Sequence, residues 1–382
     1  MKIASIRTHY LQCDISPPLG FSQSFYKHRN FLLVEIISDG GISGWGESYG
    51  MAPVTQKAIS DFYAPLLIGE DPLSIDVLWH KMWQSSLDFA RKGVMMAAMS
   101  GRDMALGDLK GKALGRSISN LMGGAARQIV PCYITGMYFQ DIPEDKLLKT
   151  LTTEAQTHAA KGYQALKIKI GKNPAFDEKL IKAVRKALPK MTLMADSNHA
   201  YDLAEATRIG RVLEEHNYHW FEEPLSPEAS HLYRQLHARL DIAIAGGECE
   251  QTRYGFRDML EAGGTDILQP DLAFCGGISE ALKIRSLASA HGKQVIPHIW
   301  GSHLNLAAAA HFLATSHSEP GRIEPQPLLL EYDNSQNPLH DIAYKKDMEI
   351  SPEGATIPTA AGLGVEIDEG GIKKLTIEKT ET

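Results

Sequence analysis

The sequence predicts an α/β fold, a (β/α)8-type barrel preceded by a separate α+β region. Two observations carry this prediction. After about Arg127, short apolar runs alternate with stretches of helical spacing, and nearly every run ends in a polar residue. These polar residues recur at intervals of 23 to 27 positions. A regular βα repeat of this size is typical of a parallel barrel, whose active site lies at the carboxyl ends of the strands.

Composition excludes several classes of partner. The 382 residues are 43% apolar and 22% charged, and 39 basic against 46 acidic side chains give a net charge of −7. This balance favours neither nucleic acid nor an anionic membrane as a partner. No segment approaches the roughly 20 apolar residues of a membrane span, and the N-terminus lacks the apolar core of a signal peptide. Four scattered cysteines fit free thiols, so we expect a cytoplasmic protein.

The N-terminal region is predicted to form strands followed by helices. Residues 31–47, FLLVEIISDGGISGWGE, are expected to form a hairpin with its turn at Asp39-Gly40-Gly41. From about Ser60 to Leu121 the apolar residues have helical spacing, and the paired glycines that follow can close a helix. This pattern predicts an α+β domain.

Seven apolar runs predict the barrel strands. They are VPCYI, ALKIKI, TLMAD, HWFEEP, AIAGGE, DILQPD and QVIPH. Six residues that can act as acids, bases or metal ligands lie at the ends of the last six runs: Lys169, Asp196, Glu222, Glu248, Asp271 and His298. An open doubly wound sheet is the alternative, but it would gather its site at one crevice rather than along consecutive strands.

Asp196, Glu222 and Glu248 are expected to converge from three successive strands. Three carboxylates without a counter-ion would repel one another, so a hard cation is the expected occupant. Oxygen ligands alone favour Mg²⁺, with Mn²⁺ as a substitute, whereas zinc sites more often contain His or Cys. Each acid by itself could be a solvated loop or helix-cap residue. Three acids in phase favour a metal centre.

Two basic groups are expected beside this centre. Lys167 and Lys169 lie two positions apart on a strand, so they face the same side. Lys169 could act as a base if Lys167 and a nearby Mg²⁺ lower its pKa. His298 lies two strands after Glu248, the last expected metal ligand, and Asp271 could hold its Nδ1–H. The α-carbon of a bound carboxylate would then have a base on each face. A Schiff-base lysine is the alternative role for either lysine.

These residues resemble the motifs of the enolase superfamily, specifically its mandelate racemase subgroup. The matching motifs are KIK at 167–169, DSN at 196–198, FEEP at 221–224, GGE at 246–248, QPD at 269–271 and PH at 297–298. The resemblance covers essentially the whole chain. It implies a modified (β/α)7β TIM-like barrel over residues 126–339. It also implies an α+β capping domain of residues 1–125, completed by residues 340–382.

The resemblance implies roles for the residues at the strand ends. The expected Mg²⁺ ligands are Asp196, Glu222 and Glu248. Lys169 is one expected acid/base, and the His298–Asp271 dyad is the other. Catalysis by such groups proceeds through an enediolate, which the metal stabilises as charge develops.

Other residues are expected to contact the substrate. Lys167 is similar to the lysine that tunes its neighbour and contacts the substrate carboxylate, and Asn198 belongs to the DSN motif. Glu331 in LLLEYD is similar to the barrel-end glutamate that hydrogen-bonds the enediolate. Specificity is implied to lie in capping loops at 17–28 and 49–55. In the first loop, polar side chains that include Ser22 and His28 suggest a polyhydroxylated ligand.

Three segments most resemble acid-sugar dehydratases and sugar-lactone cycloisomerases: DILQPDLAFCGGISE, IPHIWGS and IEPQPLLLEYDNSQNPL. The reaction implied is abstraction of the proton α to a carboxylate, followed by dehydration of an acid sugar to a 2-keto-3-deoxy product. Cycloisomerisation of a sugar lactone and racemisation or epimerisation of a 2-hydroxy acid are the alternatives. The resemblance also implies a homo-oligomer.

Overall fold

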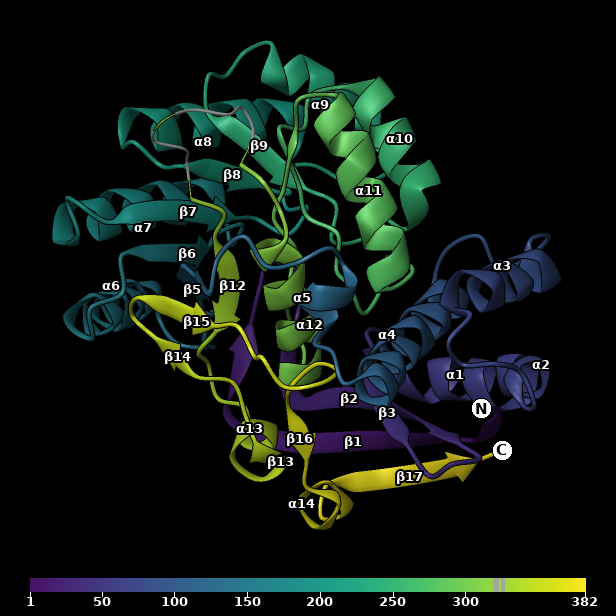
Figure 1. The fold of residues 1–382 in the computed structure, drawn as a ribbon. Helices are drawn as coiled ribbons and strands as arrows, with labels where there is room; N and C mark the ends of the chain where they lie inside the picture. Colours follow the sequence, from purple (N-terminus) through teal and green to yellow (C-terminus); the bar gives the residue numbers. More distant parts are fainter. Residues whose placement is uncertain (319–322, 324–326) are drawn as a thin grey trace.

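The computed structural model describes residues 1–318, 323 and 327–382. Glu324, Pro325 and Gln326, which belong to the third of the dehydratase-like segments, lie outside the described residues. The described chain forms a TIM-like barrel and a second, antiparallel sheet with its own helices (Figure 1). The predicted fold class is confirmed.

Eight parallel strands form the barrel sheet, in the order β11-β10-β9-β8-β7-β6-β5-β12. The strands are β5 (Cys132–Thr135), β6 (Ala165–Lys169), β7 (Thr192–Asp196), β8 (Trp220–Glu222), β9 (Ala243–Gly246), β10 (Ile267–Leu268), β11 (Gln294–Val295) and β12 (Leu330–Asp333). All seven runs predicted from the sequence contribute a strand. β12 pairs in parallel with β5, and the Ile299 amide after β11 donates to Glu331 on β12 at 2.9 Å. The two ends of the sheet therefore meet.

A helix follows each of the first seven barrel strands, which gives the (β/α)7β order. The helices are α6 (Glu144–Ala160), α7 (Pro174–Ala187), α8 (Leu203–Glu215), α9 (Ser230–His237), α10 (Thr252–Ala262), α11 (Ile278–Ala290) and α12 (His303–Ala314). Helices α6 to α11 lie outside the strands (Figure 1). α8 shows how the sequence begins such a helix. Asp202 accepts from the Glu205 amide at 2.8 Å, and the Glu205 side chain bonds back, which completes a capping box.

The second sheet has the order β17-β1-β2-β3 and is antiparallel. Its strands are β1 (Ile3–Gly20), β2 (Phe25–Ser38), β3 (Ser43–Ser48) and β17 (Thr376–Glu381). The predicted hairpin at 31–47 is the β2–β3 pair. The helices begin earlier than the predicted start at about Ser60: they are α1 (Ala52–Lys57), a π-helix (Ala58–Tyr63), α2 (Ala64–Leu67), α3 (Ile75–Ser86), α4 (Val94–Leu114) and α5 (Ile118–Leu121).

Helix α4 packs closely on this sheet because β3 carries glycines. A Cβ on Gly44 would lie 2.2 Å from the carbonyl oxygen of Ala105, and one on Gly46 would lie 2.2 Å from that of Gly101. Most of α4 is buried, and it also reaches the barrel, where Asp103 accepts from the Ser279 amide at 2.9 Å. The helix therefore joins the two parts of the molecule.

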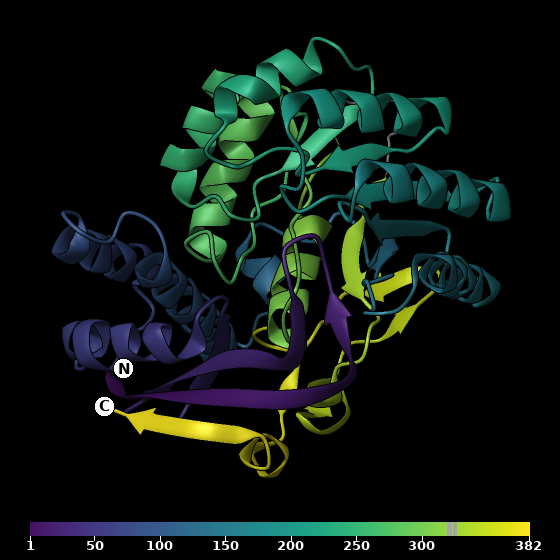
Figure 2. The same cartoon turned by 180° about the vertical axis from the view of Figure 1, so that it is seen from behind.

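The C-terminal tail has partners in both parts. β14 (Ile350–Ser351) and β15 (Gly354–Thr356) form a small sheet with β4 (Ile129–Val130), directly ahead of barrel strand β5. β17 instead pairs with β1, which brings the two termini side by side (Figures 1 and 2). The remaining tail elements are α13 (Pro338–Ile342), β13 (Tyr344–Lys346), β16 (Glu366–Ile367) and α14 (Glu369–Lys373). The predicted domain boundaries at 125 and 340 stay a prediction.

Side chains of the N-terminal sheet contact the barrel at the carboxyl ends of its strands. Buried Arg29 on β2 forms an ion pair with Asp333 at the end of β12. Glu47 on β3 accepts from the Ser302 hydroxyl at 2.6 Å, at the start of α12. Figure 2 shows β1 and β2 rising toward the barrel. Within the described residues, no helix has the length and apolar character required to cross a membrane.

Candidate active site

The chemically capable residues of the barrel lie at the carboxyl ends of its strands. Lys169 ends β6, Asp196 ends β7 and Glu222 ends β8. Lys169 is paired in register with Asp196, and Asp196 with Glu222. Glu248 follows β9 by two residues. Equal positions on neighbouring parallel strands lie side by side, so one rim receives all four groups.

Asp196, Glu222 and Glu248 form the carboxylate cluster. One carboxylate oxygen from each lies within 4.8 Å of the others. Asp196 and Glu222 are fully buried, and the Glu248 side chain is 13% exposed. Glu222 is oriented by two donors, the Trp220 indole N–H at 2.9 Å and the Gln269 amide at 2.8 Å. The cluster offers oxygen ligands alone, so it fits a hard divalent cation.

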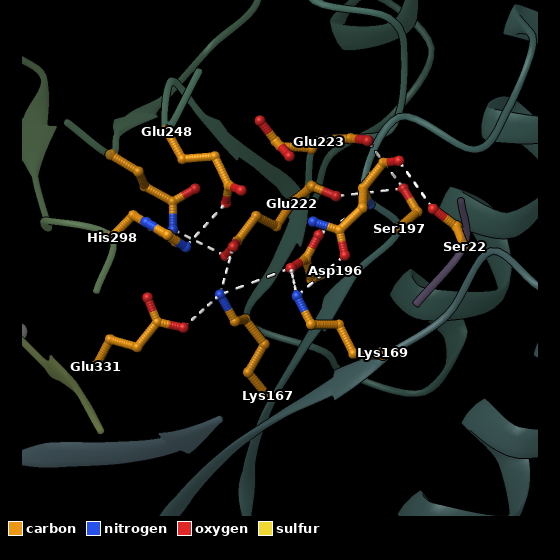
Figure 3. A network of polar contacts seen from close by, with 12 residues as sticks. Ser22, Lys167, Lys169, Asp196, Ser197, Glu222, Glu223, Glu248, His298 and Glu331 are labelled. Atoms are coloured by element: carbon orange, nitrogen blue, oxygen red, sulfur yellow. Dashed lines mark hydrogen bonds and ion pairs between the residues drawn. The ribbon is translucent and has the colours of Figure 1, made fainter. Parts of the chain in front are cut away.

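The two lysines contact different members of the cluster (Figure 3). Lys169 Nζ lies 2.5 Å from Asp196 Oδ2 and 3.0 Å from Asn198 Oδ1. Lys167 Nζ forms an ion pair with Glu222 and lies 2.8 Å from Glu331 Oε1. Both lysines are buried, so their charges need these carboxylates.

A histidine dyad lies across the cluster from Lys169 (Figure 3). His298 Nδ1 is 2.8 Å from Asp271 Oδ2, and its Nε2 is 3.5 Å from Glu248 Oε2. Asp271 is fixed in turn by the Ala273 amide at 2.7 Å and the Asn305 side chain at 3.0 Å. Because Nδ1 faces a carboxylate, Nε2 is the ring atom presented to the centre.

The pKa values show how burial and the lysines act on the three acids. Although burial opposes it, Lys169 and Lys167 hold the pKa of Asp196 at about 2. Burial raises the pKa of Glu222 to about 7 despite Lys167. Burial, reinforced by the Glu223 carboxylate, raises the pKa of Glu248 to about 8. A divalent cation among these oxygens would favour the ionised form of all three carboxylates, so the residues fit the expected metal.

The protein's own groups raise the pKa of Lys169. The expectation that Lys167 together with a nearby metal ion lowers this pKa stays a prediction. Burial and the Lys167 charge do favour deprotonation, yet the Asp196 carboxylate outweighs them. His298 behaves in the same way. Burial disfavours the imidazolium, but Glu248 and Asp271 raise the pKa of His298 to about 10.

Each of the two expected capping loops has a residue near the rim, but not all of their predicted residues lie there. Ser22 Oγ donates to the Asn198 carbonyl at 2.9 Å, and Tyr49 lies with its ring centroid 6.0 Å from that of His298. His28 does not join them. It is exposed on β2 and contacts Asp14 on the neighbouring strand, with Nδ1 2.7 Å from Oδ1.

Sequence reasoning missed several residues that hold the site. Asn305 on α12 anchors Asp271, and Gln269 anchors Glu222. Gln269 stands inside the quoted QPD motif, which was a usable signal. Asn305 lies in a mostly apolar helix, so its distance in sequence from Asp271 concealed it. Glu47 is also distant in sequence from Ser302, whose hydroxyl donates to it. Burial raises the pKa of the Glu47 carboxyl to about 7.

Family models match most of the chain. Residues 150–371 match the model described as enolase C-terminal domain-like. Residues 5–123 match that of the mandelate racemase / muconate lactonizing enzyme N-terminal domain.

Individual proteins are similar over nearly the full length. The D-galactarolactone cycloisomerase of Agrobacterium fabrum is 38% identical over 97% of this chain and 98% of its own. The crystal structure of the 3,6-anhydro-D-galactonate cycloisomerase from Zobellia galactanivorans has a TM-score of 0.89 and 35% identity, covering 99% of this chain and 100% of that one. The L-talarate/galactarate dehydratase from Salmonella typhimurium, liganded with Mg and L-lyxarohydroxamate, has a TM-score of 0.86 and 29% identity, covering 100% and 94%.

Proposed function

The chain belongs to the enolase superfamily, among its mandelate racemase-type enzymes, and on that premise we propose that it removes the proton α to the carboxylate of an acid sugar or sugar lactone. The observation that carries the proposal is the carboxylate cluster with Lys169 on one side and His298 on the other (Figure 3). Two acid/base groups that face one centre can act on the same carbon from opposite directions.

Asp196, Glu222 and Glu248 would hold the cofactor, Mg²⁺ or in its place Mn²⁺. A bound Mg²⁺ supplies positive charge that offsets the cluster and stabilises the enediolate. Once the carboxylates are offset, the attraction that raises the pKa of Lys169 and His298 weakens. Loss of a proton from either group then becomes easier.

The reaction we propose is a β-elimination. One of Lys169 and His298 accepts the proton as the α C–H bond breaks. The other gives its proton to the departing β-oxygen as the C–O bond breaks. Lys167 contacts the substrate carboxylate, and Glu331 hydrogen-bonds the enediolate as charge develops. Tautomerisation of the enol product then yields a 2-keto-3-deoxy acid, so the atoms balance without an external oxidant or reductant.

Two leaving groups fit this chemistry. A free β-hydroxyl leaves as water, which makes the enzyme a dehydratase. In a lactone the ring carboxylate is the leaving group, and it remains bound to the product through the carbon chain. The enzyme is then a cycloisomerase. The similarity to cycloisomerases over nearly the full length supports this second reaction. Racemisation or epimerisation, in which the proton returns to the same carbon, is the remaining alternative.

The loops at 17–28 and 49–55 are proposed to determine substrate specificity. Ser22 and Asn198 are joined at 2.9 Å, so the first loop is tied to the rim. We expect Asn198 and Ser22 to contact the hydroxyl groups of the ligand, whereas His28 lies on the exposed β2 surface. We also propose that residues 1–125, completed by residues 340–382, form a capping domain over a barrel of residues 126–339. The homo-oligomer and the cytoplasmic location stay predictions.

A substrate screen tests the proposal. The protein with Mg²⁺ would be incubated with a library of acid sugars and their lactones in D₂O. We expect a 2-keto product together with deuterium at the position next to the original α-carbon. Release of water from an open acid identifies a dehydratase, and ring opening of a lactone identifies a cycloisomerase. The proposal fails if no acid or lactone either yields a 2-keto product or exchanges its α-proton, or if borohydride traps a substrate on a lysine.

A further inference from the structure

A second group of donor atoms lies beside the carboxylate cluster on the same three strand ends. His199, Glu223 and Cys249 form this mixed cluster, and one donor atom from each lies within 4.8 Å of the others. His199 Nε2 is 3.0 Å from Glu223 Oε2 and 3.6 Å from Cys249 Sγ. The set offers nitrogen, oxygen and sulfur, whereas the carboxylate cluster offers oxygen alone.

The histidine is oriented as a ligand. Its Nδ1 lies 3.2 Å from the Leu225 carbonyl oxygen, which can only accept a hydrogen bond. Nδ1 therefore carries a hydrogen, and Nε2 faces Glu223 and Cys249. Although burial opposes it, Cys249 and Glu223 raise the pKa of His199 to about 11, so an ion that binds here displaces the Nε2 proton. Metal-binding histidines usually donate their other N–H to a carbonyl or carboxylate in this way. The His199 amide also donates to the Glu223 carbonyl at 2.8 Å, which holds the loop after β7 against the end of β8.

Glu223 is a buried carboxylate beside His199. The residue is 2% exposed, and its Oε2 lies 3.0 Å from His199 Nε2 without the geometry of a hydrogen bond to any described residue. Leaving a buried carboxylate oxygen without a donor is costly. Lys167 and Lys169 make their ion pairs with other carboxylates. Figure 3 shows the Glu223 carboxylate on the side of Glu222 remote from both lysines.

The spacing matches a tetrahedral zinc site. Zinc bonds of about 2.0–2.1 Å to nitrogen and oxygen and about 2.3 Å to sulfur place N and O about 3.3 Å apart and N and S about 3.6 Å apart. The distances here are 3.0 and 3.6 Å. Cys249 is exposed, and with Glu223 it lines a cavity of about 410 Å³. An ion can enter from this cavity, which also leaves space for a fourth ligand.

We propose that His199, Glu223 and Cys249 form a zinc-binding site beside the Mg²⁺ site. A mixed N, O and S set selects zinc or cobalt over magnesium, which prefers oxygen. The ion would tie the ends of β7, β8 and β9 together from the side opposite the lysines. This proposal does not depend on the identity of the substrate.

Cobalt reports directly on the sulfur ligand. Co²⁺ would be added to the full-length protein in excess Mg²⁺, and the near-ultraviolet spectrum recorded. We expect a thiolate-to-cobalt charge-transfer band, because only the mixed cluster contains sulfur. The band should disappear in Cys249→Ser and weaken in His199→Gln, and it should persist in His231→Gln, whose exposed histidine lies on α9.

Zinc affinity gives the second readout. Competition with a chromophoric chelator should show binding at least about tenfold weaker in Glu223→Gln and Cys249→Ser than in the parent protein. Zn²⁺ should also raise the melting temperature of the parent protein and not that of Cys249→Ser. Cys249 is exposed, so its replacement should leave the fold intact, and circular dichroism checks this. The proposal is overturned if the band is absent, if Cys249→Ser keeps it, or if Mg²⁺ displaces all bound zinc. In these cases His199 and Glu223 form a simple ion pair.

Discussion

The carboxylate cluster and the mixed cluster occupy the same three strand ends, yet their surroundings differ. Glu222 and Glu223 are neighbours in sequence. Glu222 receives a lysine, an indole N–H and an amide, whereas Glu223 faces an imidazole and a thiol. Two buried acids at the end of β8 therefore have chemically different partners.

Backbone conformation separates the two sets of side chains. Asn198, His199 and Glu223 have positive φ angles of 44°, 66° and 43°. Residues other than glycine adopt this region rarely, at a cost of order 1–3 kcal/mol each. The turns that follow β7 and β8 thus send successive side chains to different sides. The comparison teaches that a barrel rim can present two chemically distinct donor sets when the chain turns immediately after each strand.

The largest expected effect belongs to the groups that flank the carboxylate cluster. Lys169→Ala and His298→Ala should each lower turnover by about 10²–10⁴-fold, because each removes a proton-transfer group. In a variant that keeps exchange of the α-proton with deuterium, the residue removed is the general acid. Product formation and deuterium exchange are the measurements. Lys190→Ala, at an exposed position, is the control. Turnover near the parent value in either variant contradicts the two-group site.

Lys167 should stabilise the fold, and its contribution should be larger in the absence of metal. Lys167→Met leaves buried Glu222 and Glu331 without their cation. Breaking a buried pair typically costs about 3–5 kcal/mol of unfolding free energy. Urea unfolding in EDTA should show a loss of this order, and saturating Mg²⁺ should recover part of it. Lys182→Met, which breaks an exposed pair with Glu178, should change the value by about 0.5 kcal/mol or less. Equal losses in the two variants would mean that the cluster does not need Lys167.

The carboxylate cluster should control the response to Mg²⁺. Glu222→Gln should weaken Mg²⁺ binding by more than about tenfold, since it removes a charged ligand. Calorimetric titration measures this affinity, and activity should be lost in EDTA and return with Mg²⁺ or Mn²⁺. Glu215→Gln, at the exposed end of α8, provides a matched control. Full activity in a verified metal-free sample would exclude the metal centre.

The smallest expected effect concerns the loop that both clusters share. Asn198 and His199 lie between β7 and α8, and Asp202 caps α8. Asp202→Ala should lower the unfolding free energy by about 1 kcal/mol, whereas Asp202→Asn should retain most of the cap. Thermal unfolding compares the two variants. If Asp202→Asn costs as much as Asp202→Ala, the carboxylate acts through its charge rather than as a cap.

The strand ends could be predicted from the sequence because a barrel repeats. Each βα unit returns the chain to the same rim, so Asp196 and Glu222 could be placed together from their spacing alone. The motif resemblance added Glu331 and the tail. Ser22 lies between β1 and β2 and contacts the rim, whereas His28 lies on β2 and contacts Asp14 on β1.

Sequence by itself determined the periodic features of this protein: the barrel, the order of its strands and the acids at their ends. Only the tertiary structure decided which groups share an environment. Asn305 reaches Asp271 from another helix, and His199 meets Cys249 across two strands. Against the effects of burial and of Lys167, Asp196, 2.5 Å away, raises the pKa of Lys169. Electrostatic interactions depend on distance in space and on burial, and neither is encoded in the spacing of residues along a chain.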